Sequence, residues 1–112
     1  MRASTIVLAA ALGLLSQTAL GGDYAHCILD SAPGLQSDAA AYAAHSVCIS
    51  KYPAGLNAVE QGSGRGFFSF KSGAECTLKR ANETRSHKAA VMISVACRKL
   101  YDEPNPFDYY AK

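Results

Sequence analysis

The chain has 112 residues, and its 11 Lys and Arg residues against 9 Asp and Glu give a formal net charge of +2. This length corresponds to one small domain. A nearly neutral balance argues against nucleic-acid binding, which normally requires a clustered basic face and a high pI. The densest basic stretch, between Lys79 and Lys88, is diluted by Glu83, so we expect no nucleic-acid partner.

Residues 1–21 are typical of a secretory signal peptide. Arg2 supplies a positive start, residues 6–15 form an apolar run, and Ala19 and Gly21 precede a cleavage point that would leave Gly22 first. The run is too short to cross a bilayer, which needs ~20 residues, and no later segment is apolar enough. We therefore predict a single secreted or periplasmic domain, residues 22–112, without a membrane span.

The same cysteine spacing occurs twice in the mature chain. Cys27 and Cys48 stand 21 positions apart, and so do Cys76 and Cys97. An offset of 49 superimposes the two pairs and aligns further identical residues: Ala25 with Ala74, Leu29 with Leu78, Ala32 with Ala81, Ser37 with Ser86, Ala40 with Ala89, Ala41 with Ala90, and Tyr52 with Tyr101. Such register predicts a duplicated supersecondary unit.

We expect the four cysteines to form two disulfides, because an exported chain meets an oxidising compartment. Structural zinc sites bring cysteines in close pairs, and here each stands alone, so we expect no metal and no cofactor. The loop over residues 31–37 is long enough to align Cys27 with Cys48 in an antiparallel helix pair. This geometry favours Cys27–Cys48 and Cys76–Cys97, although the spacing does not exclude a crossed arrangement.

The first unit, about residues 24–53, is predicted to contain two helices. Asp23 can cap a short helix over residues 24–30, which the Pro33-Gly34 dipeptide follows. Ser37 or Asp38 can cap a second helix that runs to about Tyr52. The buried stripe expected on this second helix consists of Ala41, Ala44, Cys48 and Tyr52.

The connecting segment, about residues 54–73, departs from the repeat and is rich in glycine and phenylalanine. The alternation of Phe68, Ser69 and Phe70 suggests a short extended piece. Two interpretations stay open for the aromatic residues. They fill the groove between the two helix pairs, or they form an exposed recognition loop, since rigid scaffolds often present such loops. The candidate binding residues are Arg65, Phe67, Phe68 and Phe70.

The second unit, about residues 74–102, is predicted to repeat the pattern. Residues 75–80 are expected to be helical by analogy, although they would also suit a strand. Ser86 can cap a helix that runs to about Tyr101, with Ala90, Ile93, Cys97 and Leu100 or Tyr101 on its inner face. Residues 103–112 are expected to be a loosely docked tail. Asn82 begins a glycosylation triplet, relevant only in a host that glycosylates.

Catalytic signatures are missing from the sequence. Paired cysteines offer no thiolate, and no Gly-x-Ser-x-Gly, Cys-x-x-Cys or recognisable acidic pair is present. We therefore expect a protein that is not an enzyme. A weak metal or hydrolytic site formed by His26 and His45, together with Asp30, is the minor alternative.

These patterns predict an all-α domain built from two duplicated, disulfide-stapled helical hairpins. For function, the first hypothesis is a protein-interaction module, such as an inhibitor or immunity-type antagonist of an exported enzyme. The alternatives are a structural exported protein, or a carrier of a small apolar ligand between the hairpins, in a cavity lined by Ile93, Leu100 and the phenylalanines.

Overall fold

The computed structural model describes residues 22–105, so the predicted signal peptide and residues 106–112 of the predicted tail lie outside the described residues. The described part contains the α-helices α2 (Tyr24–Ser31), α3 (Asp38–Lys51), α4 (Gly73–Arg80) and α5 (His87–Tyr101), and the short 3-10 helix η1 (Gly55–Ala58). Residues 22–105 include no β-strand. The all-α prediction is confirmed, and residues 75–80 are helical rather than extended.

Short polar side chains set the start of each α-helix. Asp23, Ser37 and Ser86 accept hydrogen bonds from the backbone N–H groups three residues further on, at 2.8, 3.1 and 3.0 Å. These three caps were expected from the sequence. Ser72 caps α4 in the same way, by accepting from the N–H of Glu75 at 3.1 Å, and this cap was not predicted.

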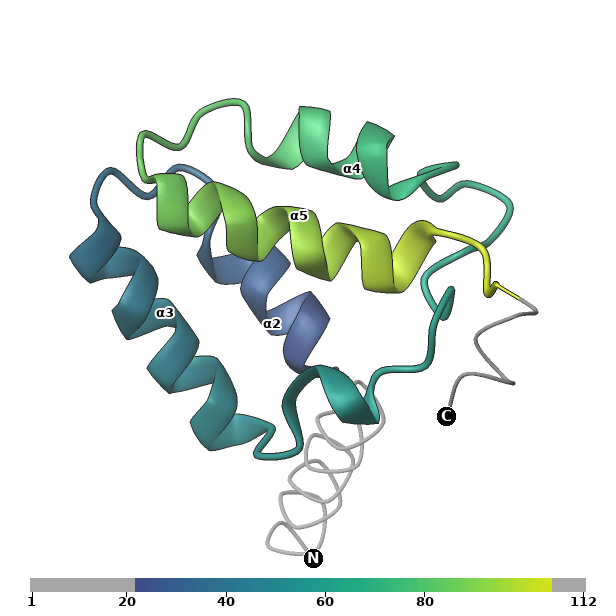
Figure 1. Ribbon diagram of the computed structural model, residues 1–112, viewed down its shortest axis with the longest axis horizontal. Coiled ribbons are helices and arrows are strands. Elements are labelled where there is room, and N and C mark those ends of the chain that lie inside the picture. Colours follow the sequence, from purple (N-terminus) through teal and green to yellow (C-terminus); the bar gives the residue numbers. More distant parts are fainter. Residues whose placement is uncertain (1–21, 106–112) are drawn as a thin grey trace, which may run out of the picture.

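Helix α5 is the centre of the molecule (Figure 1). It packs against α4 on one side and against α2 and α3 on the other. The core residues that it contributes are Ala89, Ile93, Ala96, Cys97 and Leu100. Of the predicted inner face, Ala90 is only half-buried, because the neighbouring Ala89 is the alanine that faces the core. On α3 the predicted stripe holds at Ala41, Ala44 and Cys48, which are buried, whereas Tyr52 follows the helix as its C-cap and is only half-buried.

Both disulfides join consecutive helices, as the cysteine spacing favoured. Cys27–Cys48 links α2 to α3 with a Cα–Cα distance of 5.7 Å, and Cys76–Cys97 links α4 to α5 with a distance of 5.5 Å. In each case a helix of 8 residues is tied to one of 14 or 15 residues. The predicted local pairing is confirmed, and these bonds use all four cysteines of the chain.

The connecting segment does not form the predicted extended piece. Its residues 61–65 instead lie across the end of α5, where the carbonyls after that of Arg98 lack partners within the helix. They supply one donor to each of four consecutive carbonyls: Gln61 Nε2 to Arg98 at 2.8 Å, Gly62 N to Lys99 at 2.8 Å, Gly64 N to Leu100 at 2.9 Å, and the Arg65 guanidinium to Tyr101 at 2.6 Å. The extended piece predicted at residues 68–70 is absent because the Ser69 N–H donates back to the Gly66 carbonyl in a turn, and no strand lies among residues 22–105 to pair with.

The loops that follow α2 and α4 are joined to each other. The backbone N–H of Arg85 donates to the carbonyl of Leu35 at 3.1 Å, and the hydroxyl of Thr84 donates to the same carbonyl. Asp38, the first residue of α3, accepts from the Ser86 hydroxyl at 2.6 Å and from the backbone N–H of Lys88 at 3.2 Å. These bonds fix the starts of α3 and α5 side by side.

Asp38 makes this junction sensitive to acid. The hydrogen bond from Ser86, followed by the one from the Lys88 backbone, lowers the pKa of the Asp38 carboxyl below its ordinary value of 3.8. A carboxyl with a lowered folded-state pKa stabilises the fold above its unfolded pKa, and this stability is lost as the pH falls through the folded value. The stability advantage of the wild type over Asp38→Asn should therefore be complete at about pH 6 and shrink below about pH 4. Urea unfolding across this range measures it, and a difference that stays constant with pH would contradict the assignment.

Candidate functional site

Phe67 and Phe68 stand out as large apolar side chains that the fold leaves in water. They are 94% and 96% exposed. Their ring centroids lie 4.9 Å apart and the ring planes meet at 78°, so the two rings form one edge-to-face pair. Aromatic residues of this size are normally buried, and an adjacent exposed pair is therefore the strongest candidate for a contact surface.

The loop that carries this pair is closed by its own hydrogen bonds. The backbone N–H of Gly66 donates to the hydroxyl oxygen of Ser69 at 2.8 Å, and the backbone N–H of Ser69 donates to the carbonyl of Gly66 at 3.4 Å. On the preceding side, the Arg65 guanidinium donates to the carbonyls of Tyr101 and Lys71 at 2.6 and 3.2 Å and meets the Glu103 carboxylate at 3.2 Å. The aromatic pair thus projects from a tied backbone.

Phe70 closes the loop from the other side. It is half-buried against the core, with its ring 5.2 Å from that of Tyr101, edge to face, and the Arg80 guanidinium 5.7 Å from its centroid. The four predicted binding residues therefore occupy two kinds of position. Arg65 and Phe70 are engaged within the protein and hold the loop, whereas Phe67 and Phe68 project from it. Phe67 and Phe68 have the exposure expected of a recognition loop, whereas Phe70 packs against Tyr101 and Arg80 of the second unit.

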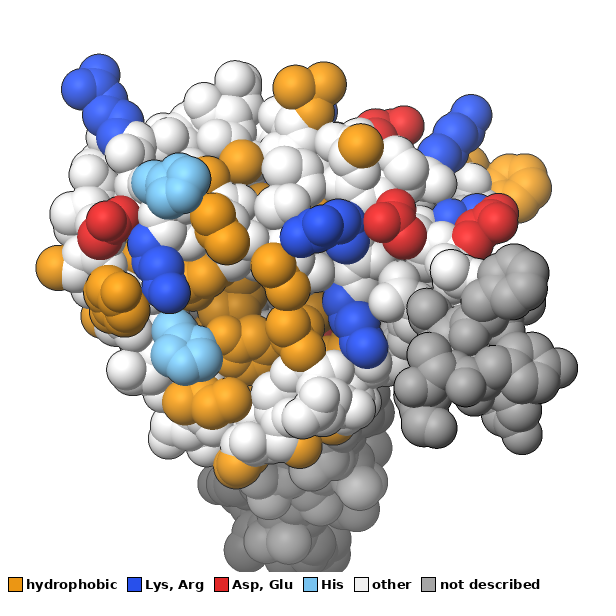
Figure 2. Space-filling view, in the orientation of Figure 1, with side chains coloured by type: hydrophobic (Ala, Val, Ile, Leu, Met, Phe, Trp, Pro, Cys, Tyr) orange, Lys and Arg blue, Asp and Glu red, His pale blue; other side chains and the backbone are white. Residues whose placement is uncertain are grey.

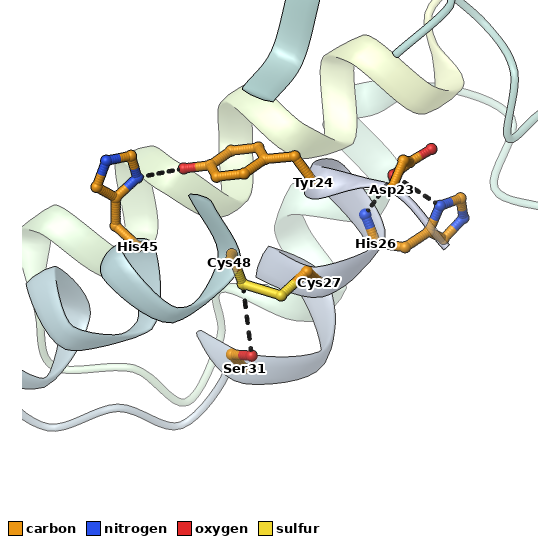
Figure 3. Close-up of a disulfide and its surroundings, with 7 residues drawn as sticks. All are labelled: Asp23, Tyr24, His26, Cys27, Ser31, His45 and Cys48. Carbon is orange, nitrogen blue, oxygen red and sulfur yellow. Dashed lines mark hydrogen bonds and ion pairs between the residues drawn. A yellow bond between two sulfur atoms is a disulfide. The ribbon is translucent and has the colours of Figure 1, made fainter. Parts of the chain in front are cut away.

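The two histidines proposed for a shared metal or hydrolytic site have separate partners (Figure 3). His26 Nδ1 pairs with the Asp23 carboxylate at 3.0 Å, and His45 Nδ1 lies 2.5 Å from the Tyr24 hydroxyl. Figure 3 shows the two imidazoles on opposite sides of the helix pair formed by α2 and α3. Within residues 22–105 no group of three potential ligands is close enough to hold a metal ion. The structure does not bring this predicted pair together.

Tyr24 itself is almost fully buried, and burial raises the pKa of its phenol. The phenol therefore keeps its proton at neutral pH, and its oxygen is hydrogen-bonded to His45 Nδ1. The two rings also meet edge to face, with centroids 5.7 Å apart. This contact ties the start of α2 to the middle of α3.

An apolar groove of about 320 Å³ lies beside Tyr24, between α3 and α5. The sequence analysis did not predict this groove. Its lining consists of Tyr24, Tyr42, His45, Leu56, Lys88, Val91, Met92, Val95 and Ala96. Ile93 and Leu100, which we predicted would line an apolar cavity, are instead fully buried in the core. The sequence feature that could have indicated the groove is the apolar character of Tyr42 and Val91, which lie outside the predicted buried stripes.

Comparison with protein-family models, with curated proteins and with solved structures found no match. Among residues 22–105, no helix combines the length and the hydropathy needed to cross a membrane.

Proposed function

We propose that this protein is a small exported protein-interaction module, an inhibitor or immunity-type antagonist of an exported enzyme, and that the loop of residues 66–70 is its contact surface. The observation that supports the proposal is the near-complete exposure of Phe67 and Phe68 on a loop tied to α5 through Arg65. Aromatic residues dominate the energetics of protein interfaces when a partner buries them.

The way the loop is held also favours binding. Ordering a flexible segment costs roughly 0.5–1.5 kcal/mol for each immobilised side chain. The Ser69–Gly66 hydrogen bonds and the Arg65 contacts meet part of that cost in the free protein. Phe67 and Phe68 can then contribute apolar burial with little loss of backbone freedom.

Export and duplication form part of the same proposal. The apolar leader and two disulfides are consistent with a mature chain that begins at Gly22 in an oxidising compartment. A duplication is supported by the matching lengths of the two helix pairs and by their caps, since Asp23 and Ser37 fall in register with Ser72 and Ser86. Two such units give a rigid base for the loop between them.

The experiment is affinity capture from the exported fraction of the host with the mature, oxidised protein. We expect one saturable partner, and we expect Phe67→Ala/Phe68→Ala to weaken its affinity by at least about 30-fold, corresponding to the loss of ~2 kcal/mol from an interface hot spot. Arg65 is left intact because it caps α5, and its loss would mix stability with binding. Adding the protein to a captured enzyme should reduce that enzyme's activity.

Val47→Ala is the matched control, since Val47 is a 53% exposed apolar residue on α3. It should bind the partner like the wild type. The midpoint of urea unfolding of both variants should equal that of the wild type, because the truncated side chains are exposed. Unchanged partner affinity in a folded Phe67→Ala/Phe68→Ala variant would contradict the role of the loop, and absence of any saturable partner would contradict the interaction module.

A further inference from the structure

We infer that the groove between α3 and α5 is a binding site for a small amphipathic anion, namely a carboxylate on a medium-length hydrocarbon chain. The inference does not depend on the function proposed for the aromatic loop. Figure 2 shows the groove as a hollow in which hydrophobic side chains gather, with histidine and basic side chains at its edge. Its volume of about 320 Å³ lies at the small end of the range of ~300–1,000 Å³ for ligand pockets.

The walls of the groove are apolar and come from separate elements. Val91, Met92 and Val95 follow one face of α5, and Leu56 of η1 lies at one end. The groove borders the core, since Ala96 is fully buried and Met92 packs against the core cluster. These walls are set by packed helices, so the hollow exists before a ligand arrives, and they suit a hydrocarbon chain rather than a polar one.

The polar groups of the lining select the head group of the ligand. They are the Lys88 ammonium, and the Tyr24 phenol and His45 imidazole, which are hydrogen-bonded to each other, and no acidic side chain lines the groove. The Lys88 Nζ atom lies 4.9 Å from the ring centroid of Tyr42 on α3, which places the ammonium at the rim between the two helices. A cationic rim above an apolar floor is complementary to a carboxylate on a hydrocarbon chain.

Asp38 is the carboxylate that contacts Lys88, and it does so through the backbone. It accepts from the backbone N–H of Lys88 and from the Ser86 hydroxyl. These bonds direct Asp38 to the first turn of α5, and it does not line the groove. The Lys88 ammonium therefore has an aromatic face beside it and remains available to a bound anion.

Titration of the mature, oxidised protein with decanoate, followed by heteronuclear NMR, tests the inference, with decanol as the neutral ligand of equal chain length. We expect saturable decanoate binding that shifts the resonances of Met92 and Val95. Lys88→Gln should weaken decanoate about fivefold, the value of ~1 kcal/mol for an exposed ion pair, and leave decanol unchanged. Lys71→Gln, which removes an exposed lysine outside the groove, should change neither affinity.

A second variant keeps the inference falsifiable if Lys88 contributes little. Val95→Glu places a carboxylate in the half-buried wall and should abolish decanoate binding. Absence of saturable binding below the aggregation concentration of decanoate would overturn the site, and so would decanoate binding that survives Val95→Glu. Equal affinity for decanol and decanoate, unchanged by Lys88→Gln, would overturn its anion selectivity. Phe67→Ala/Phe68→Ala should bind decanoate normally, which separates this site from the proposed protein contact.

Discussion

Replacing Cys76 and Cys97 together by alanine is expected to lower the free energy of unfolding by about 3 kcal/mol, the chain-entropy value for closing a loop of roughly 20 residues. The bond spans 21 positions. Both cysteines are fully buried at the contact between α4 and α5, so their loss also removes packed sulfur atoms from the core. Domains of this size are stable by only ~5–15 kcal/mol, and the change is therefore a large share of the total.

The comparison with Cys27→Ala/Cys48→Ala separates chain entropy from packing. Both disulfides span 21 positions, so the entropic contribution is the same. Helix α4 packs chiefly against α5, whereas α2 packs against α3, α5 and η1. Loss of the second disulfide should therefore destabilise the protein more than loss of the first.

Urea denaturation of both double variants and of the wild type, with and without reductant, measures the two effects. The reduced wild type should be less stable than either double variant under oxidising conditions. If the Cys76→Ala/Cys97→Ala protein unfolded at the same urea concentration as the oxidised wild type, the structural role assigned to this disulfide would be refuted.

Much of this fold could be predicted because its signals are local. Asp23, Ser37 and Ser86 are common capping residues placed directly before helical segments. The cysteine spacing favoured pairing within each helix pair, which is the pairing observed. The caps depend on residues within one turn of each other, and the two equal cysteine spacings of 21 positions can likewise be read along the chain.

The connecting segment was predicted poorly because its partners are distant in sequence. Arg65 donates to Tyr101, which lies 36 positions away, and nothing beside Arg65 indicates that it caps α5. The alternation at Phe68 and Phe70 resembles a strand, but a strand requires a neighbour with free backbone groups. The apolar groove was not predicted for the same reason, since the residues of α3 and α5 that form it meet only in the folded chain.

Gly73 is a position where a tertiary contact outweighs helix propensity. Gly73→Ala is expected to destabilise the protein by about 2 kcal/mol, within the range for overpacked positions. A Cβ atom at Gly73 would lie 2.7 Å from both Cα and Cγ of Arg98 on α5. A backbone atom cannot move aside as the end of a side chain can, so α4 would have to shift away from α5. The shift would also strain the bond of 2.7 Å from the Gly73 N–H to the Asp102 carboxylate.

Helix propensity acts only weakly in the opposite direction, because Gly73 is the first residue of α4 and the preference for alanine over glycine of roughly 0.5–1 kcal/mol applies to a helix interior. The net effect at Gly73 should still be destabilising. Gly66→Ala is the matched control, since a Cβ there meets nothing within 4 Å, and its stability should stay within about 0.5 kcal/mol of the wild type. Equal stability of Gly73→Ala and Gly66→Ala in urea denaturation would show that α4 and α5 do not depend on this close approach.

Gly73→Ala should also be coupled energetically to Cys76→Ala/Cys97→Ala, because Gly73 and the disulfide hold the same pair of helices together. Without the disulfide, α4 can move away from Arg98 more easily, so the added methyl group meets less resistance. Gly73→Ala should therefore cost less in the Cys76→Ala/Cys97→Ala background than in the wild type. A double-mutant cycle measures this difference, and strict additivity would mean that the disulfide does not enforce the close approach of α4 and α5.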